Sequence, residues 1–177
     1  MQAFTQRPQW VERGHSLCQC DPVTDSRFPE LKDYSDGEFS RFGYSPKWVS
    51  YFDHWLSEDE AASSNVMSHD LASSAGASDE YRMGEEKLEA FYGALFEAGA
   101  IRLVEGEPVV HTAFDEALAQ VVTSSLREKK LMDCYVSHLS MRVVGGYDRT
   151  DLLLFETAIS IPLVEQLASN SGLFLLT

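Results

Sequence analysis

The sequence predicts an α+β domain in which several helices pack on a small mixed or antiparallel sheet, preceded by an irregular, aromatic-rich N-terminal arm. Amphipathic stripes at helical spacing fill the middle of the chain, and strand patterns around a glycine turn fill its C-terminal third. At 177 residues the chain is long enough for one such domain with a substantial core. We therefore expect a single domain over residues 1–177.

The N-terminal quarter is expected to be an arm, and a helical layer is expected after it. Residues 1–44 intersperse proline and glycine among aromatic side chains, which suits an irregular segment laid over a core. Residues 45–75 are predicted to be helical, because Ser45-Pro46 is a favourable helix start. An apolar stripe at helical spacing follows, made of Trp48, Val49, Phe52, Trp55 and Leu56. Ser57 to Glu60 fits a capping box that opens a second, weaker helix.

Residues 68–78 have the serine- and alanine-rich composition of a mobile connector, and residues 79–177 are expected to form the core. The clearest helix of the chain carries its apolar residues from Leu88 to Phe96 and stops near Gly99. A hairpin over residues 101–110 comes next, with Pro108 confining its second strand to an edge. Asp115 then opens another long helix.

The C-terminal third reads as strand, turn, strand, helix and strand. Alternation from Tyr135 to Val144 predicts a half-buried strand, and Gly145 to Asp148 should supply the positive-φ positions of a hairpin turn. Leu152 to Phe155 is apolar on both parities, so we expect cover on both faces of that strand. A short helix with Pro162 near its start should lead to a last strand, Leu173 to Leu176, inside the sheet.

The most unusual global property is charge. The chain has 28 acidic and 14 basic residues, a formal net charge of −14, spread along its length. Such a field repels phosphate backbones and anionic lipids, so we expect neither nucleic acid nor membrane as a partner. A basic protein surface is the partner that it favours. The absence of a signal peptide pattern and the odd number of cysteines favour a reduced, cytoplasmic protein.

Few residues suggest chemistry. His15, Cys18 and Cys20 offer soft metal ligands, but a fourth ligand is missing nearby and two small buried cysteines explain the pattern equally well, so we predict no metal and no cofactor. No nucleophile elbow, triad or HExxH motif is present, and we predict no catalytic residue. His138 could still converge with the hairpin residues 148–151, although these also suit a turn and a blunted strand edge.

Taken together, excess acid without reaction chemistry favours a stoichiometric protein-binding inhibitor. We expect it to act in the manner of immunity proteins that neutralise a cognate bacterial toxin by occluding its active or substrate-binding surface. That likeness is one of general character and rests on no motif. The expected contact residues are acidic or lie at the hairpin tip: Asp53, Glu58, Asp59, Glu60, Tyr147, Asp148, Arg149 and Asp151.

Two other classes of function remain open from the sequence. One is a small enzyme of unfamiliar type, with a site near the 145–151 hairpin, between the 68–78 connector and the sheet. The other is an adaptor or chaperone that presents a groove to a client protein. A deep pocket with perturbed titrating groups would favour the enzyme, and a broad acidic face would favour the inhibitor.

Overall fold

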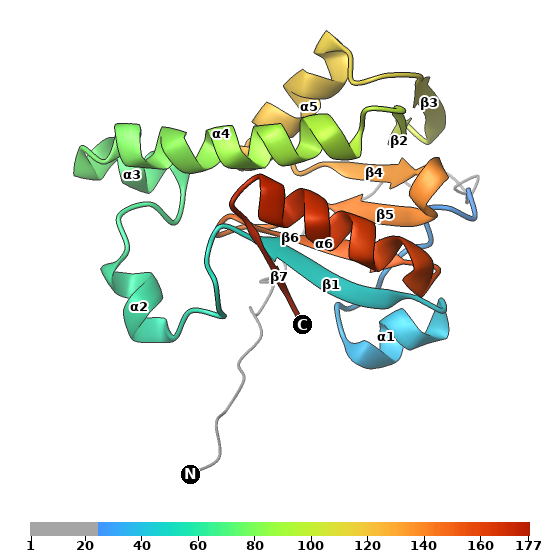
Figure 1. Cartoon of the computed structure of the whole chain (residues 1–177), viewed down its shortest axis with the longest axis horizontal. Coiled ribbons are helices and arrows are strands. Elements are labelled where there is room, and N and C mark those ends of the chain that lie inside the picture. The colour runs from blue at the N-terminus through green and yellow to red at the C-terminus, as the bar shows by residue number, and fades with distance from the viewer. Residues whose placement is uncertain (1–24) are drawn as a thin grey trace.

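The computed structural model describes residues 25–177, which form a seven-stranded antiparallel sheet with helices packed on it (Figure 1). The strand order is β3-β2-β4-β5-β6-β1-β7, and every neighbouring pair is antiparallel. The strands are β1 (Ser45–Ser50), β2 (Ala100–Val104), β3 (Glu107–His111), β4 (Asp133–Val136), β5 (Met141–Val144), β6 (Thr150–Phe155) and β7 (Phe174–Leu176). The predicted mixture of helix and sheet is confirmed, and the sheet is larger than the small one expected.

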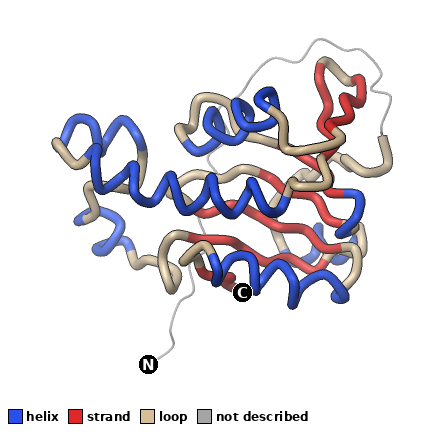
Figure 2. Tube along the Cα trace, turned by 45° about the horizontal axis from the view of Figure 1, so that its top comes forward, coloured by secondary structure: helices blue, strands red, loops and turns tan. Residues whose placement is uncertain are grey.

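Helices cover the sheet unequally, with the longer ones on one face (Figures 1 and 2). The α-helices of the described residues are α1 (Asp36–Arg41), α2 (Glu58–Ser63), α3 (His69–Ala75), α4 (Ser78–Leu95), α5 (Glu116–Leu126) and α6 (Ile161–Asn170). Helices α4, α5 and α6 pack on one face, and α1 packs on the other, where Phe39 joins a second cluster. Two short 3-10 turns, η1 (Ser137–Leu139) and η2 (Ala158–Ser160), complete the fold.

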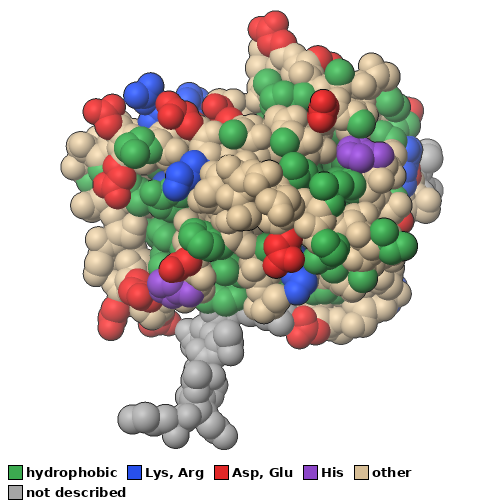
Figure 3. Space-filling view, viewed as in Figure 1, with side chains coloured by type: hydrophobic (Ala, Val, Ile, Leu, Met, Phe, Trp, Pro, Cys, Tyr) green, Lys and Arg blue, Asp and Glu red, His purple; other side chains and the backbone are tan. Residues whose placement is uncertain are grey.

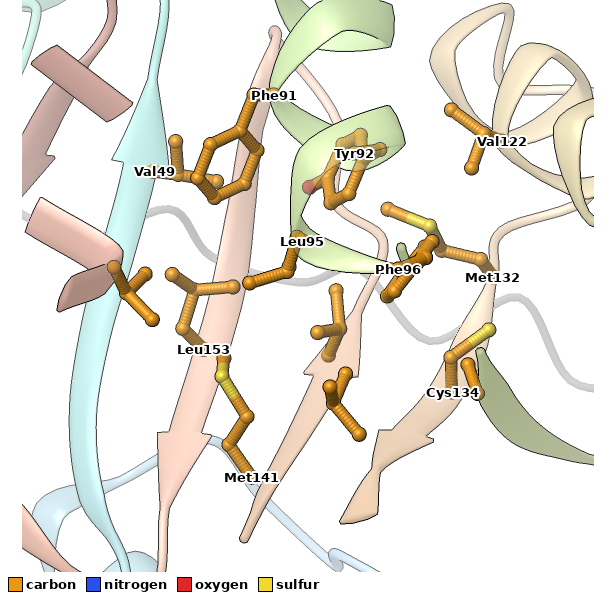
Figure 4. Packing of buried hydrophobic residues seen from close by; sticks show 14 of the residues in the cluster. Val49, Phe91, Tyr92, Leu95, Phe96, Val122, Met132, Cys134, Met141 and Leu153 are labelled. Atoms are coloured by element: carbon orange, nitrogen blue, oxygen red, sulfur yellow. The ribbon is translucent and has the colours of Figure 1, made fainter. Parts of the chain in front are cut away.

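The main core lies between α4 and the sheet (Figure 4). Phe91, Tyr92 and Leu95 of α4 and its C-cap residue Phe96 are fully buried and project toward the strands. Successive residues of β6 alternate between the two faces, Leu153 entering this core and Leu152 the cluster under α1. Both are buried, which confirms the expectation that this strand is covered on both faces.

The predicted helix over residues 45–56 is wrong, because its first half is strand β1. Trp48 and Val49 enter opposite clusters and are both buried, an arrangement that an extended chain provides between two packed layers. Strand β1 pairs with β6 on one side and β7 on the other. The helical layer expected over 45–75 is therefore reduced to α2 and α3. The capping box of α2 is confirmed, since Ser57 and Glu60 bond reciprocally.

Residues 68–78, expected to be a connector, contain a helix with both ends capped. The Ser68 hydroxyl accepts a hydrogen bond from the Leu71 backbone N–H, and Gly76 ends α3 with a φ of 72°. Ala72 is buried against α4, with which α3 packs. Local capping and this contact give the segment regular structure despite its small side chains; its mobility stays a prediction.

Three details of the C-terminal third also differ from expectation. The predicted strand 135–144 is interrupted by η1, and Ser140 reverses the chain with a φ of 47°. In the turn after β5 the positive φ angles belong to Asp148 and Arg149, whereas Gly145 is required for space, since a β-carbon there would lie 2.2 Å from Ser125 Oγ. Strand β7 lies at the edge of the sheet, where β1 is its neighbour.

The remaining elements follow the sequence pattern. Helix α4 buries the predicted apolar stripe, Asp115 caps α5, and β2 and β3 form the expected hairpin with Pro108 on an edge strand. Helix α6 has proline in its first turn as predicted. Between residues 25 and 44 the chain is irregular except for α1 and adjoining turns.

Candidate functional site at the acidic end of the sheet

Two stretches that the sequence singled out, 53–60 and 147–151, start from the same end of the sheet. Strand β1 ends there and β6 begins there, and the Tyr51 backbone N–H donates to the Arg149 carbonyl at 3.2 Å. Helices α2 and α3 and the start of α4 gather at the same end (Figure 1). We call this region the acidic end and define it by the exposed or half-buried acids Asp53, Glu58, Asp59, Glu60, Asp70, Glu128 and Asp148. Figure 3 shows acidic side chains over this part of the surface, interspersed with lysine or arginine and histidine side chains.

A buried arginine fastens the β5–β6 turn to its surroundings. The Arg149 guanidinium lies between two aromatic rings, with Cζ 4.1 Å from the Tyr51 ring centre and 4.7 Å from that of Tyr81. Its Nη2 donates to the Tyr81 carbonyl oxygen at 3.1 Å, while Nε and Nη1 are buried without a hydrogen-bond partner among the described residues. Burial lowers the pKa of Arg149. Arg149 therefore holds the turn against α4 mainly through the two flat faces of its guanidinium, which contact the tyrosine rings, and less through hydrogen bonds from its N–H groups.

The backbone of this turn is held in an uncommon conformation. Asp148 and Arg149 have φ angles of 56° and 59°, in the left-handed region that costs a non-glycine residue energy. The Thr150 backbone N–H donates to the Tyr147 carbonyl at 3.1 Å, and the Asp148 N–H donates to Glu128 Oε1 at 3.4 Å. These bonds and the Arg149 clamp present the Tyr147 and Asp148 side chains to solvent.

Beneath the turn lies a buried carboxyl group. Asp151 Oδ1 accepts from the Gly146 backbone N–H at 2.6 Å, and Oδ2 accepts from the Tyr92 hydroxyl at 2.5 Å. Burial raises the pKa of Asp151 to about 6, although the two donors oppose the rise. The carboxyl ties α4 to the turn and titrates close to neutral pH.

A second buried acid is paired directly. Glu85 receives two hydrogen bonds from Arg127, from Nε at 2.6 Å and from Nη2 at 3.0 Å. This bidentate geometry accounts for an acid that is 5% exposed within the main helix. Glu128, the next residue after Arg127, has its pKa raised by partial burial and by the charges of Asp148 and Asp70. Glu128, Asp148 and Asp70 are therefore close enough to interact, and the exposed Lys129 and Lys130 follow Glu128 in the chain.

At the outer margin an exposed histidine bridges two of the predicted acids. His54 Nδ1 lies 2.5 Å from Asp53 Oδ1, and its Nε2 lies 3.2 Å from Glu60 Oε1. The hydrogen bond with Asp53, followed by that with Glu60, raises the pKa of His54. Glu60 also serves the capping box of α2, which lowers its pKa to about 2.

The residues singled out from the sequence divide by burial. Asp53, Glu58, Asp59, Glu60, Tyr147 and Asp148 are exposed, whereas Arg149 and Asp151 are 6% and 3% exposed and hold the turn from inside. His138 does not converge with them, because η1 joins β4 to β5 at the opposite end of β5 from the turn. His15, Cys18 and Cys20 lie outside the described residues.

Sequence reasoning missed the partners that organise this end: Tyr51, Tyr81, Gly84, Tyr92 and Glu128. None carries a local signal, because each acts on residues distant in the chain. Elsewhere the structure supplies the partners of a buried histidine, His111, whose Nδ1 lies 3.0 Å from Asp115 Oδ2 and whose Nε2 accepts from Arg102 Nε. Because Arg102 occupies Nε2, this pair fastens β3 to the start of α5 and leaves no nitrogen for a nucleophile.

Comparisons of the chain with family models, curated proteins and solved structures find no match. Within residues 25–177 no group of three His, Cys, Asp or Glu side chains is arranged to hold a metal ion. None of the helices in that range has the length and apolar character needed to cross a bilayer.

Proposed function

We propose that the protein is a stoichiometric inhibitor that docks its acidic end onto the basic surface of a partner protein. It would act as immunity proteins do on a cognate bacterial toxin, by occluding the surface that the toxin uses. The observation that carries the proposal is the contact of Tyr51 with Arg149, which fixes the start of the loop leading to α2 beside the β5–β6 turn. Acidic side chains from two stretches distant in the chain are thereby carried to the same end of the sheet.

The chemistry of such a face suits recognition of lysine and arginine side chains. Glu58 and Asp59 are exposed on α2, which buries no residue of its own, so their carboxylates are available to a partner. The exposed ring of Tyr147, 48% accessible beside Asp148, offers an apolar contact at the tip of a fastened turn. A net charge of −14 would steer a basic partner during encounter.

The test is capture of the partner with matched bait proteins. The bait variant carries Glu58→Lys and Asp59→Lys, which reverse charge on α2 without touching Glu60 and its capping box. The control carries Glu105→Lys and Glu107→Lys, two exposed acids of the β2–β3 hairpin, remote from α2 (Figure 1). Both variants change the net charge equally, so they separate a local effect from a global one.

We expect the wild type and the control to retain a basic protein at low salt and to release it as salt screens the charges. The α2 variant should associate at least about tenfold more slowly, because steering depends on local charge complementarity. Equal capture by both variants would show that the acidic end is not the binding surface. Capture of no protein by any bait would refute the proposed function itself.

A small enzyme with a site near the 145–151 hairpin is the second candidate. The observation in its favour is the pKa of Asp151, raised by burial to about 6, since titrating groups near neutral pH often mark reactive sites. Against it, Asp151 is 3% exposed and both of its oxygens already accept hydrogen bonds from the protein. A substrate would have to displace Tyr92 or Gly146 to reach it.

A further inference from the structure

The two edges of the sheet differ in how they are protected. At one edge β3 exposes Glu107 and Pro108, a charge and a residue without an N–H, which are devices that discourage pairing. At the other edge β7 consists of Phe174, Leu175 and Leu176, without charge or proline. Within residues 25–177 no strand pairs with the outer side of β7.

The chain around β7 is also depleted of charge. Residues 157–177 contain one charged side chain, Glu165, whereas 24% of the whole chain is charged. Two copies of a protein with a net charge of −14 repel each other wherever their acids face. A contact between copies therefore requires a surface without acids, and the side chains of β7 provide one, while the turn before it lies beside the cation of Lys87, whose Nζ would be 3.5 Å from a β-carbon at Gly172.

We propose that a second copy of this chain pairs with β7 about a two-fold axis, so that the two sheets continue into one another. Such a contact is self-complementary, as a symmetric dimer requires. Antiparallel pairing also separates the β5–β6 turns of the two copies. Phe174 is opposite Ser50, at the end of β1 that lies beside this turn, so reversal of the second strand carries its turn to the far side.

Phe174 is the side chain on which this contact depends. Strand β7 has three residues and can form few ladder hydrogen bonds, so side-chain burial must supply the rest of the energy. Phe174 is 44% exposed on the face that carries Trp48 and Leu176, and it has apolar surface left to bury. In antiparallel pairing centred on Leu175, the Phe174 ring of each copy meets this same face of the other.

The experiment measures mass in solution by light scattering and sedimentation over a dilution series. We compare wild type with Phe174→Lys and with Val110→Lys, a matched change of an exposed apolar residue on the opposite edge strand, β3. Wild type and Val110→Lys should have about twice the monomer mass of 19.8 kDa at high concentration. Phe174→Lys should raise the dissociation constant of the dimer by at least about tenfold, because it places a charge in the seam.

Salt separates this contact from docking of a basic partner. Association between acidic copies should strengthen as added salt screens their repulsion, whereas binding of a basic partner should weaken. A wild type that stays monomeric at every concentration and salt level overturns the proposal, and so does a Phe174→Lys variant that dimerises as wild type does. Equal circular dichroism spectra and melting temperatures of the two lysine variants would verify that the fold is intact. If Phe174→Lys does not fold, Phe174→Ser is measured in its place, with the same expected and contradicting results.

Discussion

The guanidinium of Arg149 lies directly against the backbone of Gly84 on α4. A β-carbon at position 84 would fall 1.7 Å from Nη2 and 2.4 Å from Cζ, so the arginine occupies the space that any other residue's side chain would need. Tyr51 and Tyr81 cover the two faces of the same group. The position of the β5–β6 turn therefore depends on the absence of a side chain at residue 84.

Gly84→Ala should destabilise the protein by about 1–3 kcal/mol, the range for forcing extra volume into packed surroundings. The matched control is Gly93→Ala on the same helix, where the new β-carbon would make an ordinary contact 3.6 Å from Phe114. That change should be neutral or stabilise by up to about 1 kcal/mol, because alanine favours the helix interior. Urea unfolding measures both, and equal effects of the two changes would refute the close approach of Arg149.

Asp151→Asn should flatten the dependence of stability on pH. The folded pKa of Asp151, about 6, is higher than its ordinary value of 3.8, so the folded state binds the proton more tightly. The contribution of Asp151 to the free energy of unfolding is at most about 3 kcal/mol; it is fully present below pH 3.8 and is lost as pH rises through 6. The measurement is the difference in unfolding free energy between wild type and variant across this window. A difference that does not vary with pH would show that Asp151 does not titrate there.

Tyr92→Phe removes one of the two donors to Asp151 and should cost more as the carboxyl ionises. We expect a loss of about 1.5–3 kcal/mol above pH 6, typical of a hydrogen bond to a charged group, and a smaller loss at pH 5. Tyr81→Phe is the control, since its hydroxyl donates to the neutral carbonyl of Leu126. Its cost should not change between the two pH values. Equal pH dependence in both variants would contradict a link between Tyr92 and the titration of Asp151.

Cys134 should be unreactive in the folded protein. The side chain is fully buried in the main core, and burial raises the pKa of its thiol to about 12, so almost no thiolate exists at neutral pH. Iodoacetamide should therefore modify Cys134 only after denaturation. Peptide mapping by mass spectrometry measures the modification of Cys134 separately from that of the other cysteines. Modification of the native protein at the denatured rate would show that the core opens there.

Local patterns were enough to predict much of the architecture. The stripe of α4, the Asp115 cap of α5, the capping box at Ser57 and the β2–β3 hairpin with Pro108 at an edge all depend on near neighbours in the chain. Each is encoded within a few residues, which is the range over which caps, turns and periodicity act. The acids of α2 and of the β5–β6 turn were singled out for the same reason.

Tertiary structure alone decided what lies beside what. The residues from Ser45 to Ser50 have a helix start signal, but Trp48 and Val49 each find an apolar layer on opposite sides of the sheet, and burial of both outweighs the local preference. The clamp of Arg149 by Tyr51 and Tyr81, and the bond from Tyr92 to Asp151, join residues tens of positions apart. The sequence by itself determined which helices and strands could form and where the charged residues lie along the chain. Only the folded chain decided which buried groups lie in contact, because a contact between residues far apart in the chain leaves no pattern among neighbouring residues.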